Sequence, residues 1–177
     1  MTKPETLHIL AIEARRSRYG YALFEGPKRL LDWGGSAVPA ELTGKAAMEA
    51  ARKRITSTLR RCHPVVAVVR RPRKMRNEKG MLPGPIWRTI VAEATALSIP
   101  VYYVSGVEVR DAFRLFRGGT KEQIAELLVG IFPELLRRLP PKRKKWQPEY
   151  RGMIVFDAVA AGFAYWHRNG TLFPPPE

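Results

Sequence analysis

Two long runs of basic residues carry the clearest chemistry in this sequence. The first, residues 52–88, contains twelve lysines and arginines but a single acid. The second, residues 137–151, also holds one acid, Glu149, together with the aromatic residues Trp146 and Tyr150. Cations bind the phosphate backbone of nucleic acids, and aromatic rings stack on bases. We interpret both runs as phosphate-contacting surfaces, with an ordinary solvated face as the alternative for either run taken alone.

The charge of the whole chain points the same way. Its 177 residues carry 31 lysines and arginines against 16 acids, a formal net charge of +15. Such a balance predicts a polyanionic partner, nucleic acid first and an anionic membrane second. The longest apolar segment, MIVFDAVAAGFAYW, is too short to cross a bilayer and contains Asp157. The start, MTKPETLHIL, lacks the layout of a signal peptide. We therefore expect no membrane contact and a cytoplasmic protein, free or associated with the nucleoid.

Residue types that bind metals or move protons give weaker signals. The three histidines, His8, His63 and His167, show no ligand spacing and are interpreted as structural. From the sequence alone, Glu13 reads as an exposed acid at a strand end. Asp157 has apolar neighbours and should have a specific partner, because an unpaired buried carboxylate is costly.

Hydrophobic periodicity predicts the elements that position these residues. Strands are expected at residues 7–14, 19–26 and 28–38, with only short turns between them, which makes an antiparallel meander. Two further strands are expected at residues 65–69 and 99–105. Apolar positions at helical spacing predict helices over residues 44–61, from Pro85 to about residue 97, and over 109–116, 120–138 and 153–168. Thr120 and Gln123 form a capping box, and Pro133 should kink or divide the helix that follows.

This order predicts an α/β protein: a five-stranded mixed sheet flanked by helices, in a single domain over residues 1–177. The order and three local motifs resemble the RuvC-type Holliday junction resolvases of the ribonuclease H-like superfamily. The motifs are ILAIEARRSRYGYAL, IWRTIVAEATALSIPVYYVSGVEVRDAFRLFRGGTKEQIAELL and FDAVAAGFAYW. The resemblance covers about residues 7–168, and it implies a ribonuclease H-like fold.

The resemblance also implies a catalytic site. In that family four carboxylates bind two divalent ions, which activate water and stabilise the leaving oxygen of a phosphodiester. One acid lies on the first strand, one at the end of the fourth strand, and two lie three residues apart on the last helix. Here Glu13 matches the first-strand acid, Asp157 matches the second acid of the last helix, and Lys121 matches a lysine that can contact substrate phosphate.

Two of the four positions have lost their acids. Arg70 stands where the fourth strand should end in a carboxylate, and Ile154 stands where the last helix should carry its first acid. Arg15 replaces the small residue expected two positions after the first-strand acid. The resemblance therefore implies a degenerate site in which no metal is expected, with Glu13 and Asp157 as the ligands if one binds. We hypothesise that Arg70 occupies the metal region as a permanent cation paired with Glu13 or Asp157. Glu93, Glu108 or Asp111 would complete a metal site only in a different register.

The leading hypothesis is thus a RuvC-like protein that binds structured or branched DNA, in preference to RNA, and has a degenerate nuclease site. One alternative is an active endonuclease that uses Mg²⁺ or Mn²⁺ through Glu13 and Asp157, assisted by Lys121. Another is a non-catalytic subunit that serves as a docking platform in a nucleic-acid complex. The resemblance also implies a homodimer. The residues expected to bind nucleic acid are Arg15, Arg70, Arg71, Arg73, Lys74, Arg76, Lys142, Arg143, Lys144 and Lys145.

Overall fold

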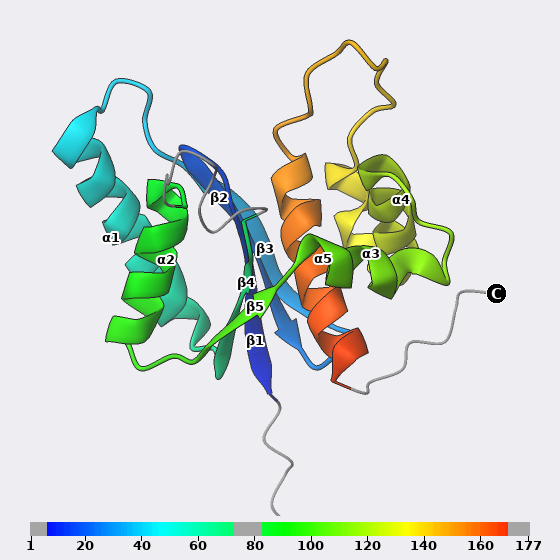
Figure 1. Cartoon of the computed structure of the whole chain (residues 1–177), viewed down its shortest axis with the longest axis horizontal. Helices are drawn as coiled ribbons and strands as arrows, with labels where there is room; N and C mark the ends of the chain where they lie inside the picture. Colours follow the sequence, from blue (N-terminus) through cyan, green and yellow to red (C-terminus); the bar gives the residue numbers. More distant parts are fainter. Residues whose placement is uncertain (1–6, 73–82, 170–177) are drawn as a thin grey trace, which may run out of the picture.

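The structure, a computed structural model, describes residues 7–72 and 83–169 of the chain. Its elements follow the predicted order (Figure 1). They are β1 (His8–Ala14), β2 (Arg18–Glu25), β3 (Leu30–Ala37), α1 (Gly44–Cys62), β4 (Val66–Arg70), α2 (Pro85–Ala96), β5 (Val101–Val104), α3 (Gly106–Arg114), α4 (Lys121–Ile131), the 3₁₀ helix η1 (Pro133–Arg138) and α5 (Met153–Arg168).

The five strands form one mixed sheet in the order β3-β2-β1-β4-β5. β1 pairs antiparallel with β2, and β2 pairs antiparallel with β3, as the short turns between them require. β4 lies parallel to β1, and β5 lies parallel to β4. The predicted five-stranded mixed sheet is therefore confirmed, and the carboxyl ends of β1, β4 and β5 lie along one end of it.

Helices cover both faces of the sheet: α1 and α2 lie on one side, and α3, α4 and α5 lie on the other (Figure 1). Alternate residues of β1 serve the two cores, because successive side chains of a strand point to opposite faces. Leu10 and Ile12 belong to the core beneath α1 and α2. Ile9 and Ala11 belong to the core beneath α5. The same alternation places Glu13 on the α5 face.

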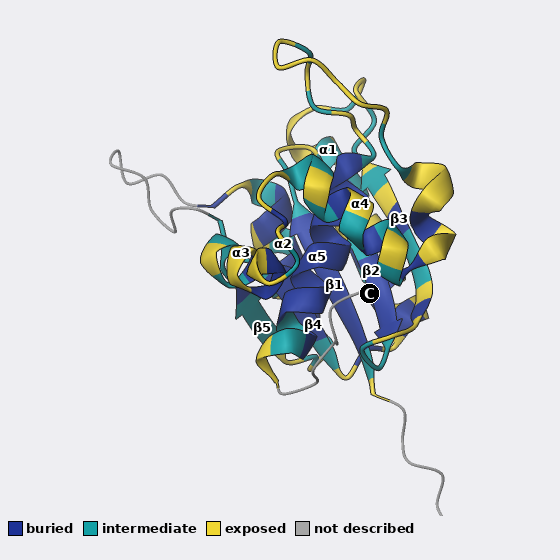
Figure 2. Cartoon of the chain, turned by 90° about the vertical axis from the view of Figure 1, so that its right-hand side faces the viewer, coloured by how far each residue is buried: buried dark blue, intermediate teal, exposed yellow. Residues whose placement is uncertain are grey.

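α5 is the central helix of its layer and is buried along most of its length (Figure 2). Two glycines let it approach β2 closely. A Cβ atom added to Gly20 would lie 2.4 Å from the carbonyl oxygen of Ile154. One added to Gly162 would lie 2.2 Å from the ring of Phe24. The first turns of α5 therefore rest directly on the strand that pairs with the end of β1.

Several local expectations are confirmed, and some boundaries shift. The capping box of Thr120 and Gln123 is present. The helix is divided at Pro133, where α4 has ended and η1 begins. The short helix α3 begins three residues before its predicted start, because Ser105 and Glu108 form a second capping box. Among the described residues, no helix is long and apolar enough to cross a bilayer.

Candidate functional site

The candidate site lies where β1 and β4 end, beneath the first turns of α5. Glu13 is the penultimate residue of β1, and Arg70 is the last residue of β4. Val68 belongs to the α5 core, so Arg70, two residues later, lies on that same face. Asp157 lies on α5 and is only 7% exposed. The structure thus places Glu13, Arg70 and Asp157 together at one end of the sheet.

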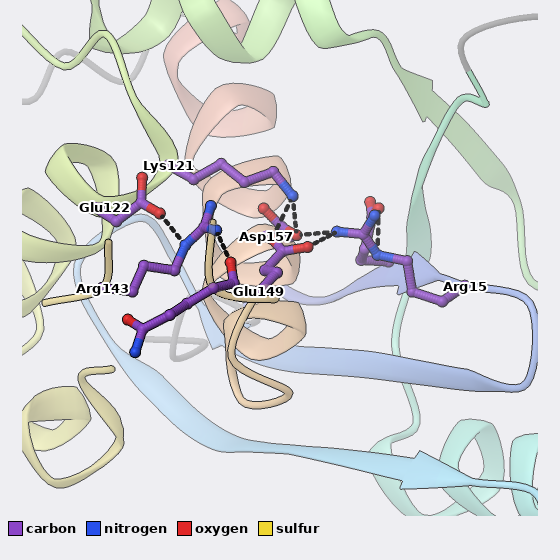
Figure 3. A network of polar contacts seen from close by, with 8 residues as sticks. Arg15, Lys121, Glu122, Arg143, Glu149 and Asp157 are labelled. Carbon is purple, nitrogen blue, oxygen red and sulfur yellow. Dashed lines mark hydrogen bonds and ion pairs between the residues drawn. The ribbon is translucent and has the colours of Figure 1, made fainter. Parts of the chain in front are cut away.

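Two cations bind the carboxylate of Asp157 (Figure 3). Arg15, in the turn after β1, places its Nη2 atom 2.5 Å from Oδ2 of Asp157. Lys121, the first residue of α4, donates to the same oxygen at 3.0 Å. Both contacts satisfy a carboxylate that would otherwise be buried without a partner. The specific partner expected for Asp157 is therefore a pair of basic side chains.

A third carboxylate, that of Glu149, joins the same cations. Lys121 donates to Oε1 of Glu149 at 2.7 Å, and Nη2 of Arg15 lies 3.7 Å from its Oε2. Partial burial tends to raise the pKa of Glu149, but the contacts with Lys121 and Arg15 together hold it below its usual value. Glu149 lies in the long loop before α5, where no periodicity or motif spacing marks it. Its only signal in the sequence was that it is the single acid of a basic run.

Glu13 is in a different electrostatic state. It is 8% exposed, and its Oε2 atom has no hydrogen-bond partner within the described parts of the chain. Its nearest ion pair is long, 3.7 Å from Oε1 to Nε of Arg15. Burial and the charge of Asp157 raise the pKa of Glu13 from 4.5 to about 7, against the opposing effect of Arg70, Arg15 and Lys121. Near neutral pH this carboxyl group is therefore partly protonated.

The hypothesis that Arg70 pairs with Glu13 or Asp157 needs correction. The cations in contact with those acids are Arg15 and Lys121. Within the described residues Arg70 makes no ion pair shorter than 4.0 Å, and it acts on Glu13 only through its charge. A guanidinium nitrogen of Arg70 instead lies against Gly106 at the start of α3, 3.2 Å from where a Cβ atom would stand. The sequence correctly suggested an internal cation, and the charge of Arg70 does lower the pKa of Glu13, but the direct ion pairs are made by Arg15 and Lys121.

Ile154, three residues before Asp157, is an apolar residue with 4% exposure. Its side chain lies near β3, where its Cγ2 atom is 3.8 Å from the position of a Gly35 Cβ atom. It offers no ligand atom. Of the other acids considered for a metal site, Glu93 accepts a hydrogen bond from Thr56, and Glu108 caps α3. Asp111 is exposed on α3.

These residues do not fit the pair of divalent ions that the resemblance implies. Across residues 7–72 and 83–169, no group of three or more His, Cys, Asp and Glu side chains is arranged to hold a metal ion. Glu13, Asp157 and Glu149 face three cations of their own chain: Arg15, Lys121 and Arg70. Lys121 and Arg15 both bind Oδ2 of Asp157, one of the oxygens that a metal would need. The arrangement can bind an anion, or hold a proton on Glu13, more readily than it can bind a divalent cation.

The residues expected to bind nucleic acid fall into three groups, apart from Arg70, which is partly buried at the end of β4. Arg15 and Arg143 form ion pairs within the chain: Arg15 with Asp157, and Arg143 with Glu122 at 2.9 Å. Lys142, Lys144, Lys145 and Arg71 are exposed. Arg73, Lys74 and Arg76 lie outside the described residues.

Comparison with solved structures identifies the fold. Thermus thermophilus RuvC in complex with a Holliday junction substrate matches 93% of this chain and 97% of its own, with a TM-score of 0.67 and 20% identity. The yeast mitochondrial Holliday junction resolvase matches 92% of this chain and 81% of its own, with a TM-score of 0.58 and 12% identity. The Fowlpox virus resolvase, in complex with Holliday junction DNA, matches 92% and 98%, with a TM-score of 0.51 and 12% identity.

Neither a protein-family model nor a curated protein matches the sequence. The chain nevertheless has the ribonuclease H-like fold, in the form found in RuvC-type Holliday junction resolvases. At these identities the likeness establishes the fold alone, and any activity has to be inferred from the residues of the site.

Proposed function

We propose that this protein binds structured or branched DNA at the end of the sheet where Glu13 and Asp157 lie, and that its nuclease site is degenerate. The main observation behind the degenerate site is the contact of Arg15 with Asp157, at 2.5 Å. A guanidinium of the chain itself bonds to the carboxylate that a metal ion would need. Solved resolvases of the same fold in complex with junction DNA support the choice of substrate.

Electrostatics decides against a two-metal site. Two divalent ions would bring four positive charges to a place that already holds Arg15, Lys121 and Arg70. At about 5 Å and an effective dielectric constant of about 20, each unit pair of like charges costs roughly 3 kcal/mol. A metal that used Oδ2 of Asp157 would also have to break the bonds of that oxygen to both cations. The three carboxylates present at most cancel the charge of these three cations, which leaves no net negative charge to attract two divalent ions.

A basic groove next to the site supports the assignment of a polyanionic partner. It has a volume of about 1270 Å³ and runs from the turn after β1 towards the first turns of α1 and α2. Arg16, Arg18 and Arg151 line it together with apolar residues of the segment between β3 and α1. Arginine side chains suit phosphate groups, and an apolar floor suits bases.

Two measurements on the purified chain test the proposal. Binding of a four-way DNA junction and of a duplex of equal length, at increasing salt, should show tight, salt-sensitive association. Cleavage of the same junction should be negligible in either Mg²⁺ or Mn²⁺. Efficient cleavage would instead establish the active endonuclease that acts through Glu13, Asp157 and Lys121. Absence of binding would reject nucleic acid as the direct partner and favour the docking subunit.

A further inference from the structure

The loop between η1 and α5 contains a turn of fixed shape. In it, the backbone N–H of Gln147 donates to the carbonyl of Lys144 at 3.0 Å. The side-chain oxygen of Gln147 accepts from the N–H of Lys144 at 2.8 Å, so two hydrogen bonds join Lys144 and Gln147 across the turn. Arg143 then joins it to α4 by donating to the carbonyl of Gln147 at 2.7 Å and to Glu122 at 2.9 Å.

Trp146 stands in this turn with 76% of its surface exposed. The contrast with other tryptophans of the chain is large, since Trp87 and Trp166 are only 9% and 8% exposed. Apart from a cation–π contact, in which Nζ of Lys144 lies 5.8 Å from the ring centroid, this indole is open to solvent. An exposed aromatic ring next to basic side chains is the combination on which proteins stack the bases of single-stranded nucleic acids.

The turn stands at the same end of the molecule as the candidate site. The loop rises beyond the carboxyl end of β1 (orange in Figure 1) and is mostly exposed (Figure 2). The part of the loop between this turn and α5 is fixed in the candidate site, because Glu149 accepts a hydrogen bond from Lys121. Lys144 lies over the ring, and Lys142 and Lys145 are exposed within four positions of Trp146 in the sequence. The turn therefore presents a flat aromatic face among cations, beside the groove proposed to receive DNA.

We propose that Trp146 stacks on an unpaired base, so that the protein prefers DNA in which bases leave the helical stack, at branch points and in single-stranded segments. This inference rests on the proposed function. A stacking ring needs a free base face, and a continuous duplex offers its faces only at its ends. The neighbouring lysines bind phosphates in any sequence and so contribute to all forms of DNA.

The test compares Trp146→Ala and Trp146→Phe with the wild type on a four-way junction, a single-stranded oligonucleotide and a continuous duplex. Loss of one stacked base should weaken binding of the first two by about 10-fold or more. Duplex affinity should change less than about 2-fold, and Trp146→Phe should keep most of the preference. Quenching of the tryptophan emission by the oligonucleotide should disappear in both variants. Leu115→Ala, which removes another exposed apolar side chain, serves as the control and should change nothing.

The outcomes separate the two proposals. Equal affinities of Trp146→Ala and the wild type for all three ligands would overturn the stacking role and leave DNA binding intact. An equal loss on all three would also overturn it, because the ring would then not discriminate unpaired bases. A wild type that binds none of the ligands would overturn the proposed function together with this inference.

Discussion

Arg15 and Asp157, 142 positions apart in the sequence, form the shortest contact of the site, with Nη2 of the arginine 2.5 Å from Oδ2 of the aspartate. Nη2 also lies 3.7 Å from Glu149, and Nε lies 3.7 Å from Glu13. These contacts, against the effect of burial, raise the pKa of Arg15. One arginine thus interacts with all three carboxylates of the site.

The first prediction concerns the stability that Arg15 provides. Arg15→Ala removes a charged hydrogen bond from a largely buried carboxylate, so we expect the free energy of unfolding to fall by about 1–3 kcal/mol. Arg29→Ala is the matched control, because Arg29 and Glu25 also lie 2.5 Å apart but on the surface. That change should cost about 0–1 kcal/mol. Urea unfolding of both variants measures the difference, and equal losses would argue against the special role of Arg15.

The second prediction concerns pH and Glu13. Its pKa in the folded protein, about 7, lies above the ordinary value of 4.5, so the folded chain binds this proton more tightly than the unfolded chain does. Its contribution to stability is therefore complete below about pH 4.5 and is lost as the pH rises through 7. Glu13→Gln removes the titration. The variant should be more stable than the wild type at pH 8, by up to about 3 kcal/mol, and the gap should close towards pH 5.

Comparing the wild type with Glu13→Gln at each pH isolates the contribution of Glu13 to stability, because the other groups titrate in both proteins. Glu149, whose pKa is lowered by Lys121 despite partial burial, behaves in the opposite sense: its contribution is lost as the pH falls. Urea unfolding at several pH values between 5 and 8 provides the test. A constant difference between wild type and Glu13→Gln would mean that Glu13 titrates normally.

The third prediction concerns the close approach of α5 to β2. Gly20→Ala would place a methyl group 2.4 Å from the carbonyl oxygen of Ile154, and backbone would have to move. We expect a loss of about 1–3 kcal/mol in stability. Gly130→Ala in α4 meets nothing within 4 Å and should stabilise the protein by about 0.5–1 kcal/mol, because alanine favours helix over glycine. Thermal unfolding should show shifts of opposite sign, and a neutral Gly20→Ala would contradict the packing described.

The fourth prediction concerns the basic loop. Lys144→Ala with Lys145→Ala should weaken DNA binding and reduce the slope of log affinity against log salt by about 0.9 for each phosphate that the protein no longer neutralises. Arg143 stays unchanged because it joins the turn to α4. Lys28→Ala with Arg29→Ala removes two exposed charges from the turn between β2 and β3, at the opposite end of the sheet, and should leave the slope as it is. Equal slopes for the two double variants would remove the loop from the binding surface.

The sequence predicted the fold well because periodicity and capping are local signals. The capping box at Thr120 and the break at Pro133 are examples. The site was harder, since it depends on contacts between distant residues. Arg15 was noted as a bulky replacement, yet its partner Asp157 becomes visible only when the turn after β1 meets α5. Glu149 lies in a loop without periodic pattern, so only the folded chain shows that it belongs to the site.

Strand alternation, by contrast, is a strong guide to which face a residue occupies. It places Glu13 and Arg70 on one face of neighbouring parallel strands, and the structure places both there. What alternation cannot give is the direction of a long flexible side chain. A guanidinium nitrogen of Arg70 lies against Gly106, and the side chain acts on Glu13 through its charge without the direct ion pair that its position suggested.

The central claim is that cations of the chain have replaced metal ions at this site. Calorimetric titration of Mn²⁺ into the wild type and into the triple variant Arg15→Ala, Arg70→Glu, Ile154→Asp tests it most directly. The variant removes two cations and supplies two carboxylates beside Glu13 and Asp157. Its control carries Arg15→Ala, Arg70→Gln and Ile154→Asn, with similar shapes and no added charge. We predict saturable Mn²⁺ binding by the triple variant alone. Paired Mn²⁺ binding by the wild type, with junction cleavage that Glu13→Gln or Asp157→Asn abolishes, would contradict the account.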